Sequence, residues 1–249
     1  MSEWLFDLGN SRLKCAPLID GRVGAIQAVA HDGLAFEAAL SSILPDRIDA
    51  AWISSVAGTR LSVELLDTLT PRCRRLCIAR TQAAFAGVQV AYAHPRALGV
   101  DRFLALLAAR ARGTGACLVA GIGTALTIDL LDAGGVHLGG RIAPSPALMR
   151  EALHRRAPQL PPAGGGYVEF AGTTADALAS GCEGAAMGLV GESLAAAARR
   201  LGAPPALLLH GGGAEALLAH LSHALHAPAL VLEGLLAWRA AATARAAAG

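Results

Sequence analysis

Short apolar runs alternate with longer helix-like stretches along the 249 residues of the chain. Each run is bounded by glycine, proline or serine, as strands commonly are, and the longer stretches repeat apolar positions at helical spacing. The runs predict strands at residues 4–7, 51–55, 76–79, 117–120, 127–131 and 206–209. The longer stretches predict helices at residues 34–44, 60–69, 101–112, 145–157, 174–201 and 215–221. This alternation predicts an α/β fold.

Two of the predicted strands run into turns made of small residues. The first turn lies in Asp7-Leu8-Gly9-Asn10-Ser11-Arg12-Leu13-Lys14, and the second lies in Gly121-Ile122-Gly123-Thr124-Ala125. Glycine leaves backbone N–H groups accessible to phosphate oxygens, and each turn has a hydroxyl side chain beside it. The Gly-Lys-Ser/Thr ending of a P-loop is absent from the sequence. Two phosphate-binding hairpins therefore predict a two-lobed phosphotransferase that holds ATP between duplicated lobes.

Composition narrows the classes of protein to which the chain can belong. Hydrophobic residues make up 54% of it, enough for a sizeable core, and a net charge of +2 argues against a nucleic-acid partner. The longest uncharged stretch, 113–128, is short and rich in glycine, so we expect no membrane span. No basic region followed by an apolar one begins the chain, and the odd number of cysteines is typical of free thiols. We therefore expect a cytoplasmic protein.

Glycine and proline also mark the expected internal boundaries. The joint Gly113-Thr114-Gly115 precedes the second turn, which predicts an N-terminal lobe over residues 1–114 and a C-terminal lobe over residues 115–249. Residues 158–166, rich in proline and glycine, predict a loop inside the second lobe. This loop either closes over a ligand or is a tolerated surface insertion, and the pattern favours neither.

Asp7 is the first candidate for chemistry. A carboxylate at the end of a strand, beside a turn with accessible amides, can hold a magnesium-bound water while the amides hold phosphate. Alternatively, the aspartate only caps the turn. Lys14 on the following strand either reaches phosphate or lies at a hairpin edge.

Asp101 is the second candidate, at the start of the predicted helix that follows Tyr92-Ala93-His94-Pro95-Arg96-Ala97-Leu98-Gly99-Val100. An aspartate there is a good helix cap. A catalytic base that accepts a proton from a substrate hydroxyl would occupy the same place, next to Arg102, which can bind an anionic substrate. The two roles are compatible.

Several ordered motifs together make the chain similar to the type III pantothenate kinase family, a branch of the actin, sugar-kinase and heat-shock chaperone superfamily. The similarity runs from Phe6 to about Gly234. Its motifs are Asp7 to Lys14, Ser54-Ser55-Val56, Tyr92 to Arg102, Gly123 to Asp129, Gly139 to Pro144, Thr173 to Ala177 and Gly211-Gly212. The resemblance implies a duplicated actin-like, ribonuclease H-like ATPase fold, with the adenosine side in the C-terminal lobe.

The resemblance also implies roles for the matching positions. ATP would be contacted by Phe6, Asp7, Leu8, Gly9, Asn10, Ser11, Arg12 and Leu13, and by Thr124 from the other lobe. Asp101 corresponds to the general base, and Asp7 would hold Mg²⁺ through water. The pantothenate-binding positions are Tyr92, Gly99, Val100, Asp101, Arg102 and Thr174.

Two positions depart from the family pattern. Many members have an aspartate that binds K⁺ or NH₄⁺ where this chain has Gly121, so the monovalent cation is doubtful here. Asp129 on the same hairpin is an alternative ligand. Ser145 replaces the last glycine of a Gly-Gly-x-Ile-x-Pro-Gly stretch and can cap a helix.

The implied reaction transfers the γ-phosphoryl group of ATP to the primary hydroxyl of pantothenate, which gives 4'-phosphopantothenate in the first step of coenzyme A biosynthesis. Two alternatives stay open: a non-enzymatic regulatory accessory protein that retains the ATP fold, and a kinase for another small alcohol. The resemblance implies a homodimer with an acceptor pocket completed across the interface. The glycines of the 174–201 helix (181, 184, 188 and 191) serve either a dimer seam or an internal packing face.

Overall fold

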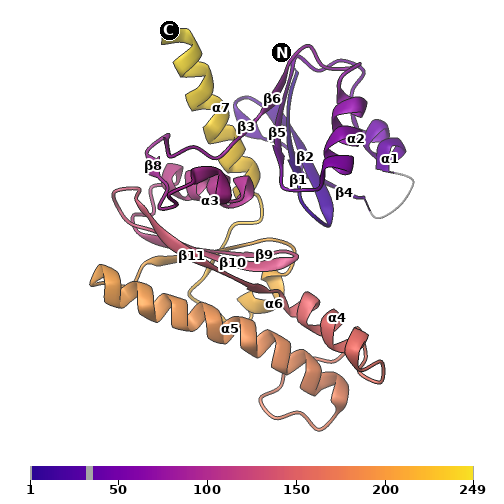
Figure 1. Ribbon diagram of the computed structural model, residues 1–249, viewed down its shortest axis with the longest axis vertical. Helices are drawn as coiled ribbons and strands as arrows, with labels where there is room; N and C mark the ends of the chain where they lie inside the picture. The colour runs from indigo at the N-terminus through magenta and orange to yellow at the C-terminus, as the bar shows by residue number, and fades with distance from the viewer. Residues whose placement is uncertain (1, 32–35, 249) are drawn as a thin grey trace. The chain divides into compact units, whose positions relative to one another are not determined.

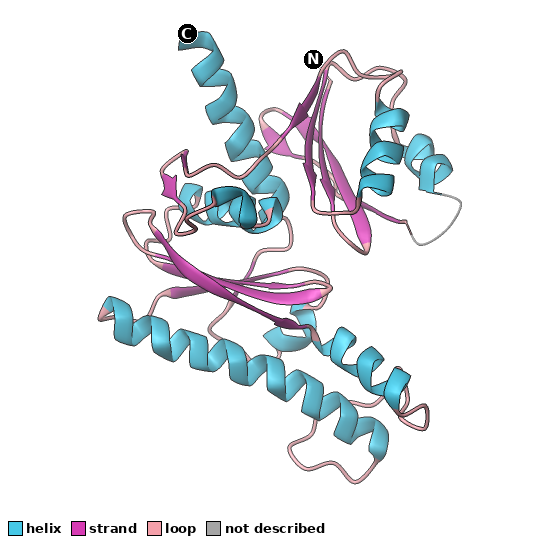
Figure 2. Cartoon of the chain, viewed as in Figure 1, coloured by secondary structure: helices cyan, strands magenta, loops and turns pink. Residues whose placement is uncertain are grey.

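The computed structural model describes residues 2–31 and 36–248, which divide into two compact units. Unit 1 consists of Met1–Gly113 together with Ala229–Gly249, and unit 2 consists of Thr114–Pro228. Each unit combines a β-sheet with helices (Figures 1 and 2). The predicted α/β class is therefore confirmed.

Unit 1 is built around a mixed sheet with the strand order β3-β2-β1-β5-β6, and β4 also pairs with β2. Its strands are β1 (Glu3–Leu8), β2 (Arg12–Ile19), β3 (Arg22–Val23), β4 (Gln27–Ala30), β5 (Ala50–Ser55) and β6 (Leu76–Ile78), with a separate hairpin of β7 (Ala84–Phe85) and β8 (Val88–Gln89). Its helices are α1 (Phe36–Ile43), α2 (Thr59–Leu69), the 3₁₀ turn η1 (Pro95–Ala97), α3 (Val100–Ala111) and α7 (Leu230–Ala248).

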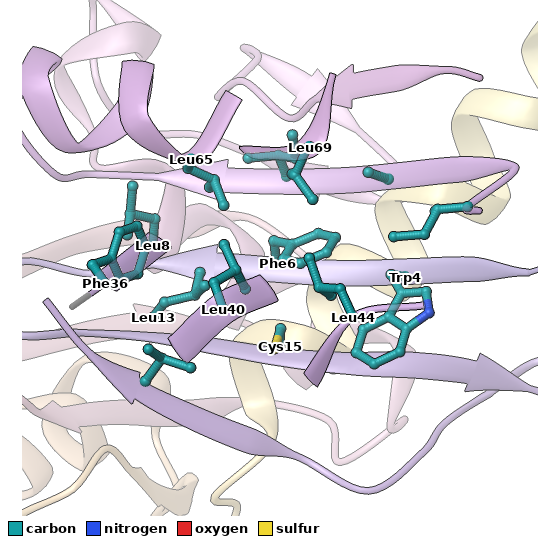
Figure 3. Packing of buried hydrophobic residues seen from close by; sticks show 14 residues of the cluster. Trp4, Phe6, Leu8, Leu13, Cys15, Phe36, Leu40, Leu44, Leu65 and Leu69 are labelled. Atoms are coloured by element: carbon teal, nitrogen blue, oxygen red, sulfur yellow. The ribbon is translucent and has the colours of Figure 1, made fainter. Parts of the chain in front are cut away.

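Alternation along β1 puts Trp4, Phe6 and Leu8 on one face of the sheet and Glu3, Leu5 and Asp7 on the other. Trp4, Phe6 and Leu8 pack with residues of α1 and α2, among them Phe36 (Figure 3). Full burial of such a side chain contributes about 1.5–3 kcal/mol to folding. Because successive side chains point to opposite faces, Asp7 lies on the face turned away from this cluster.

Helix α7 joins unit 1, whereas the sequence analysis placed residues 229–249 in the second lobe. It packs on α3 so closely that a β carbon at Gly234 would collide with the backbone of Leu104. Arg112 makes two 2.8 Å hydrogen bonds to Glu233, which link the same two helices. No helix was predicted here, because alanine and leucine surround this helix without a periodic polar face.

Unit 2 contains a sheet with the strand order β11-β10-β9-β12-β13. Its elements are β9 (Cys117–Ile122), β10 (Ala125–Leu131), β11 (His137–Pro144), α4 (Pro146–Arg156), α5 (Thr174–Leu201), β12 (Ala206–His210), α6 (Ala214–Leu218) and β13 (Leu225–His226). One face of the sheet packs on α5 and α6 through a cluster that includes Ile122, Leu126 and Leu209. Figure 1 shows α5 running along this sheet.

Most predicted elements lie where the pattern placed them, and the differences are local. Helix α5 has the predicted bounds, and Ser145 caps α4 by accepting a hydrogen bond from the N–H of Leu148 at 3.3 Å. Helix α6 ends at Leu218 and is shorter than predicted. Strand β11 was missed, because Gly139 and Gly140 are unusual within a strand. Of the predicted 34–44 helix, residues 34 and 35 lie outside the described residues.

The predicted loop at 158–166 is anchored to the helices on both sides of it. The N–H of Gly166 donates to Asp176 at 2.9 Å, and Arg150 of α4 donates to the carbonyl of Gly164. A β carbon at Gly165 would collide with the backbone of Ala175, so the loop lies directly against the start of α5. Within the part of the chain that the structure describes, no helix has the length and apolar character needed to span a membrane.

Candidate active site

The first glycine turn closes the antiparallel hairpin between β1 and β2. The N–H of Gly9 donates to the carbonyl of Arg12 at 3.1 Å, and Asn10 and Ser11 are exposed at the tip. The side chains of Phe6, Leu8 and Leu13, all predicted to contact ATP, are completely buried. Any contact of these three residues with phosphate would therefore come from the backbone.

Asp7 lies one residue before the end of β1, between its strand neighbours Lys14 on β2 and Ser54 on β5. Burial raises the pKa of this carboxyl to about 7, and the negative charge of Asp101 contributes to the rise. The polar hydroxyl of Ser54 and the positive charge of Lys14 act in the opposite direction and lower the pKa. Asp7 Oδ1 and Ser54 Oγ are both buried without a hydrogen-bond partner among the described residues. This oxygen of Asp7 therefore does not cap the turn.

Asp101 lies in the first turn of α3, whose N-cap position is occupied by Gly99. Its Oδ1 accepts a 2.8 Å hydrogen bond from the N–H of Arg102, so it satisfies one of the unpaired N–H groups of that turn. The preceding backbone is fixed because Thr81 donates to the carbonyl of Leu98 at 2.8 Å. Asp101 therefore stabilises the start of α3 from within the first turn and not from the N-cap position. This role is compatible with a catalytic one.

Gly99 makes room for the Asp101 carboxylate. A β carbon at position 99 would lie 2.6 Å from Asp101 Oδ1, whereas Val56, its nearest neighbour apart from Asp101, is 4.0 Å away. Glycine at this position therefore leaves room for the observed orientation of the Asp101 carboxylate. Its backbone angles, φ −51° and ψ 137°, are open to any residue.

Tyr92 and Arg102 form a contact beside this aspartate. The guanidinium of Arg102 lies 5.9 Å from the centre of the Tyr92 ring, and Nη1 donates to the phenol oxygen at 3.3 Å. Arg102 is 6% exposed, so its charge sits in a partly desolvated environment where an anion would be bound strongly. Unit 1 thus brings together Asp7, Asp101, Tyr92 and Arg102.

The second glycine turn closes the hairpin between β9 and β10 in unit 2. The N–H of Gly123 donates to the carbonyl of Ala125 at 2.9 Å, and Thr124 is exposed at the tip. The N–H of Gly213 donates to the carbonyl of Ile122 at 3.0 Å, which brings the glycine loop after β12 beside this turn. Gly211 has φ +96° and packs on the Ile122 backbone, where a side chain would collide. This explains the first glycine of the matching Gly211-Gly212 motif.

Gly121 is flanked by two polar side chains on neighbouring strands. It pairs with His210 of β12 and with Thr127 of β10. A β carbon at Gly121 would lie 2.7 Å from His210 Nε2 and 2.8 Å from Thr127 Oγ1. The imidazole therefore takes up the room that a side chain at position 121 would need. Sequence reasoning missed His210, since only strand pairing brings it beside Gly121.

Asp129, the alternative cation ligand, is engaged elsewhere. Its Oδ1 lies 2.9 Å from His137 Nε2, and both side chains are almost completely buried. A buried carboxylate with a hydrogen-bonded imidazole partner is satisfied without a cation. Thr174, the remaining predicted substrate residue, is exposed at the first position of α5. It lies in unit 2 with Thr124.

Comparison with known proteins agrees with this description. The fold is similar to that of a ROK family glucokinase from Streptomyces griseus in complex with glucose and AMPPNP, with a TM-score of 0.54, 13% identity, and coverage of 98% of this chain and 100% of that one. The chain therefore has the α/β fold of the actin-like ATPases, which includes sugar kinases.

Sequence comparison identifies the family within this class. A model of the type III pantothenate kinase family matches residues 4–196. The type III pantothenate kinase of Xanthomonas campestris pv. campestris strain B100 is 57% identical over 238 residues, 96% of this chain and 97% of the relative. That of Xanthomonas axonopodis pv. citri strain 306 is 55% identical over 244 residues, 98% of this chain and 99% of the relative. The chain belongs to the type III pantothenate kinase family.

Proposed function

We propose that the protein transfers the γ-phosphoryl group of ATP to the primary hydroxyl of pantothenate, the first step toward coenzyme A. Membership of the type III pantothenate kinase family supports the reaction. The observation that supports the chemistry at the site is the pair of carboxylates in unit 1, Asp7 and Asp101, which are near enough for one to raise the pKa of the other.

Asp101 is the general base in this proposal. Phosphoryl transfer has a loose transition state, so the protein contributes mainly alignment and charge neutralisation, and the base accepts the hydroxyl proton as attack proceeds. The hydrogen bond from the N–H of Arg102 holds the carboxylate in one orientation. Arg102 and Tyr92 bind the acceptor, with Gly99, Val100 and Thr174 as further contacts.

The ATP phosphates are bound by the backbone of the two turns, from Phe6 to Leu13 and at Thr124. Mg²⁺ fits the surroundings of Asp7, because Asp7 Oδ1 is buried and lacks a hydrogen-bond partner in the part of the chain that the structure describes. Asp7 would hold the ion through a water molecule, and the ion would neutralise charge on the phosphates. A nearby cation would also offset the cost of the buried carboxylate.

The monovalent cation is the point at which this chain departs from the pattern. The position of the expected carboxylate is Gly121, and His210 and Thr127 occupy the adjacent room. Asp129 is paired with His137. We infer that catalysis by this protein requires Mg²⁺ and does not depend on K⁺ or NH₄⁺.

The proposed active form is a homodimer in the cytoplasm. Gly181, Gly188 and Gly191 lie exposed on α5, and a β carbon at any of them would have no neighbour within 4 Å among the described residues, whereas one at Gly184 would lie 3.8 Å from the Tyr167 ring. Internal packing therefore applies to Gly184, while a second helix could approach closely at the other three glycines. Phe170, just before α5, is 98% exposed, which supports an intermolecular contact near this helix.

A screen of acceptors with ATP and Mg²⁺ tests the function. Pantothenate should be phosphorylated, and sugars and other small alcohols should not. In the same assay, Asp101→Asn should lower kcat about a hundredfold or more, equal to about 2.7 kcal/mol of barrier, with ATP affinity nearly unchanged. Turnover of another alcohol in preference to pantothenate would overturn the substrate assignment, and near-normal kcat in the variant would overturn the role of Asp101.

A further inference from the structure

His31 lies outside every motif that the sequence analysis identified, yet it contacts the first phosphate turn. It follows β4, which pairs with β2 so that Ala30 is the partner of Arg12. Its Nε2 lies 2.9 Å from the carbonyl oxygen of Gly9. Because a carbonyl oxygen only accepts hydrogen bonds, Nε2 must carry the proton and donate.

This hydrogen bond fixes the direction of the peptide between Gly9 and Asn10. In a trans peptide the C=O and the following N–H point in opposite directions, and no cis peptide is present among the described residues. With the Gly9 carbonyl held by His31, the N–H of Asn10 points away from His31 at the exposed end of the hairpin. Glycine at position 9 lowers the barrier to a flip of this peptide, so the turn itself does not secure that direction.

The imidazole is held firmly enough to act as such a support. His31 is 7% exposed, and its ring meets the Phe36 ring edge-on, with centroids 6.0 Å apart and an interplanar angle of 90°. Phe36 in turn packs in the apolar cluster with Leu8 and Leu13, the residues on either side of the turn (Figure 3). Both ends of the hydrogen bond are thus fixed by one cluster of buried residues.

We infer that His31 is a positioning residue for nucleotide binding: it holds the Gly9–Asn10 peptide with its N–H directed to the phosphates of ATP. The inference rests on the proposed function only for the identity of the ligand. It goes beyond the family motifs, because it assigns control of the backbone geometry of the first phosphate turn to a histidine that follows a neighbouring strand.

Two substitutions at position 31 separate this role from general packing. His31→Gln places an amide nitrogen where Nε2 lies, and His31→Asn places one where Nδ1 lies, too short to reach Gly9. Both remove the aromatic contact with Phe36 and should lower the melting temperature similarly. His31→Asn should raise the KM for ATP about three- to tenfold, the range for one lost buried hydrogen bond, with the KM for pantothenate unchanged. His31→Gln should retain most of the ATP affinity.

Leu69→Val is the packing control: Leu69 is buried in the same cluster but lies on α2, so the substitution should lower stability without changing the KM for ATP. Calorimetric titration with Mg²⁺ and a non-hydrolysable ATP analogue measures the same effect without turnover. A wild-type protein that binds the analogue but does not phosphorylate pantothenate would refute the proposed function and leave the inference about His31 testable. Equal ATP affinity in His31→Asn and His31→Gln would overturn the inference.

Discussion

Asp101 Oδ1 occupies the space in which a side chain at Gly99 would begin, since a β carbon at position 99 would lie 2.6 Å from it. The glycine and the aspartate therefore form one unit: the N-cap of α3 is bare so that the carboxylate in the first turn can lie over it. This relationship explains a glycine at a position whose backbone angles do not demand one.

Gly99→Ala should therefore displace the carboxylate without disturbing the fold. The methyl group would be too near only to Asp101, whose side chain can rotate away. Misplacement of a reacting group by about 1 Å can cost a factor of about a hundred. We expect kcat to fall at least about tenfold, measured by steady-state kinetics with pantothenate, while the melting temperature changes by less than about 3 °C.

Gly58→Ala is the matched control. Gly58 is the N-cap residue of α2, with φ −61° and ψ 162°, and no atom of the described residues would lie within 4 Å of a β carbon there. Both substitutions exchange an N-cap glycine for alanine, so their effects on stability should be similar. If Gly58→Ala lowered kcat as much as Gly99→Ala, the loss would reflect helix capping rather than displacement of Asp101.

The elements with a strong local signal were predictable from the sequence. Helix α5 has a Thr173 cap at its start and Gly202 with φ +78° at its end, and both signals stand in the sequence. Helix α7 has no such periodicity, and its position is decided by close packing at Gly234, which only the folded chain reveals.

The site was predictable to the extent that its residues lie in contiguous motifs. Asp7 and Asp101 each stand at the end of a recognisable segment, and the structure brings them into electrostatic contact. His31 and His210 were not recognisable, because a single histidine has no spacing pattern, even where, as at His210, it directly precedes the Gly211-Gly212 motif. Strand pairing, between β4 and β2 in one case and between β12 and β9 in the other, brings them to the turns.

The contact between Glu3 and Arg239 predicts a pH-dependent contribution to the stability of unit 1. Arg239 of α7 donates two 2.7 Å hydrogen bonds to the Glu3 carboxylate, and the Trp52 indole donates a third at 2.6 Å. The hydrogen bonds from Arg239 are the main cause that lowers the pKa of Glu3 below its ordinary value of 4.5. The contribution is therefore complete above pH 4.5 and is lost as the pH falls through the lower folded-state pKa.

Glu3→Gln should lower the free energy of unfolding by about 1–2 kcal/mol at pH 7, since charged hydrogen bonds in a partly buried pair are lost. Urea unfolding followed by tryptophan fluorescence measures it, and the difference from wild type should vanish at acid pH. Glu192→Gln removes an exposed pair with Arg199 on α5 and should cost less than about 0.5 kcal/mol. A Glu3→Gln deficit that is equal at pH 7 and pH 3 would contradict the assignment to the ionised carboxylate.

The exposed glycine face of α5 predicts how the proposed homodimer can be separated. Gly188→Arg places a long charged side chain on this face, and arginine is a better helix former than glycine, so the folded protomer should not lose stability. Light scattering should report a monomer, with the kcat/KM for pantothenate at least about tenfold lower. The control Val63→Arg, at an exposed position of α2, should leave the dimer mass measured by light scattering unchanged. A fully active wild-type monomer at working concentration would contradict the proposal.

The room around Gly121 predicts the response to monovalent cations. A weakly hydrated cation needs several oxygen ligands to offset its lost hydration, and no side chain extends from position 121 to supply one. Replacing an inert bulky cation by K⁺ or NH₄⁺ at equal ionic strength should therefore change kcat by less than about twofold, which corresponds to a barrier change of under about 0.4 kcal/mol.

Gly121→Asp alone should lower the melting temperature, because its β carbon would meet His210 and Thr127. Combined with His210→Ala and Thr127→Ala, which remove both close atoms, the same aspartate has room, and K⁺ should then stimulate turnover. Tenfold or greater stimulation of the wild type by K⁺ would show that other groups form the cation site without a carboxylate at position 121.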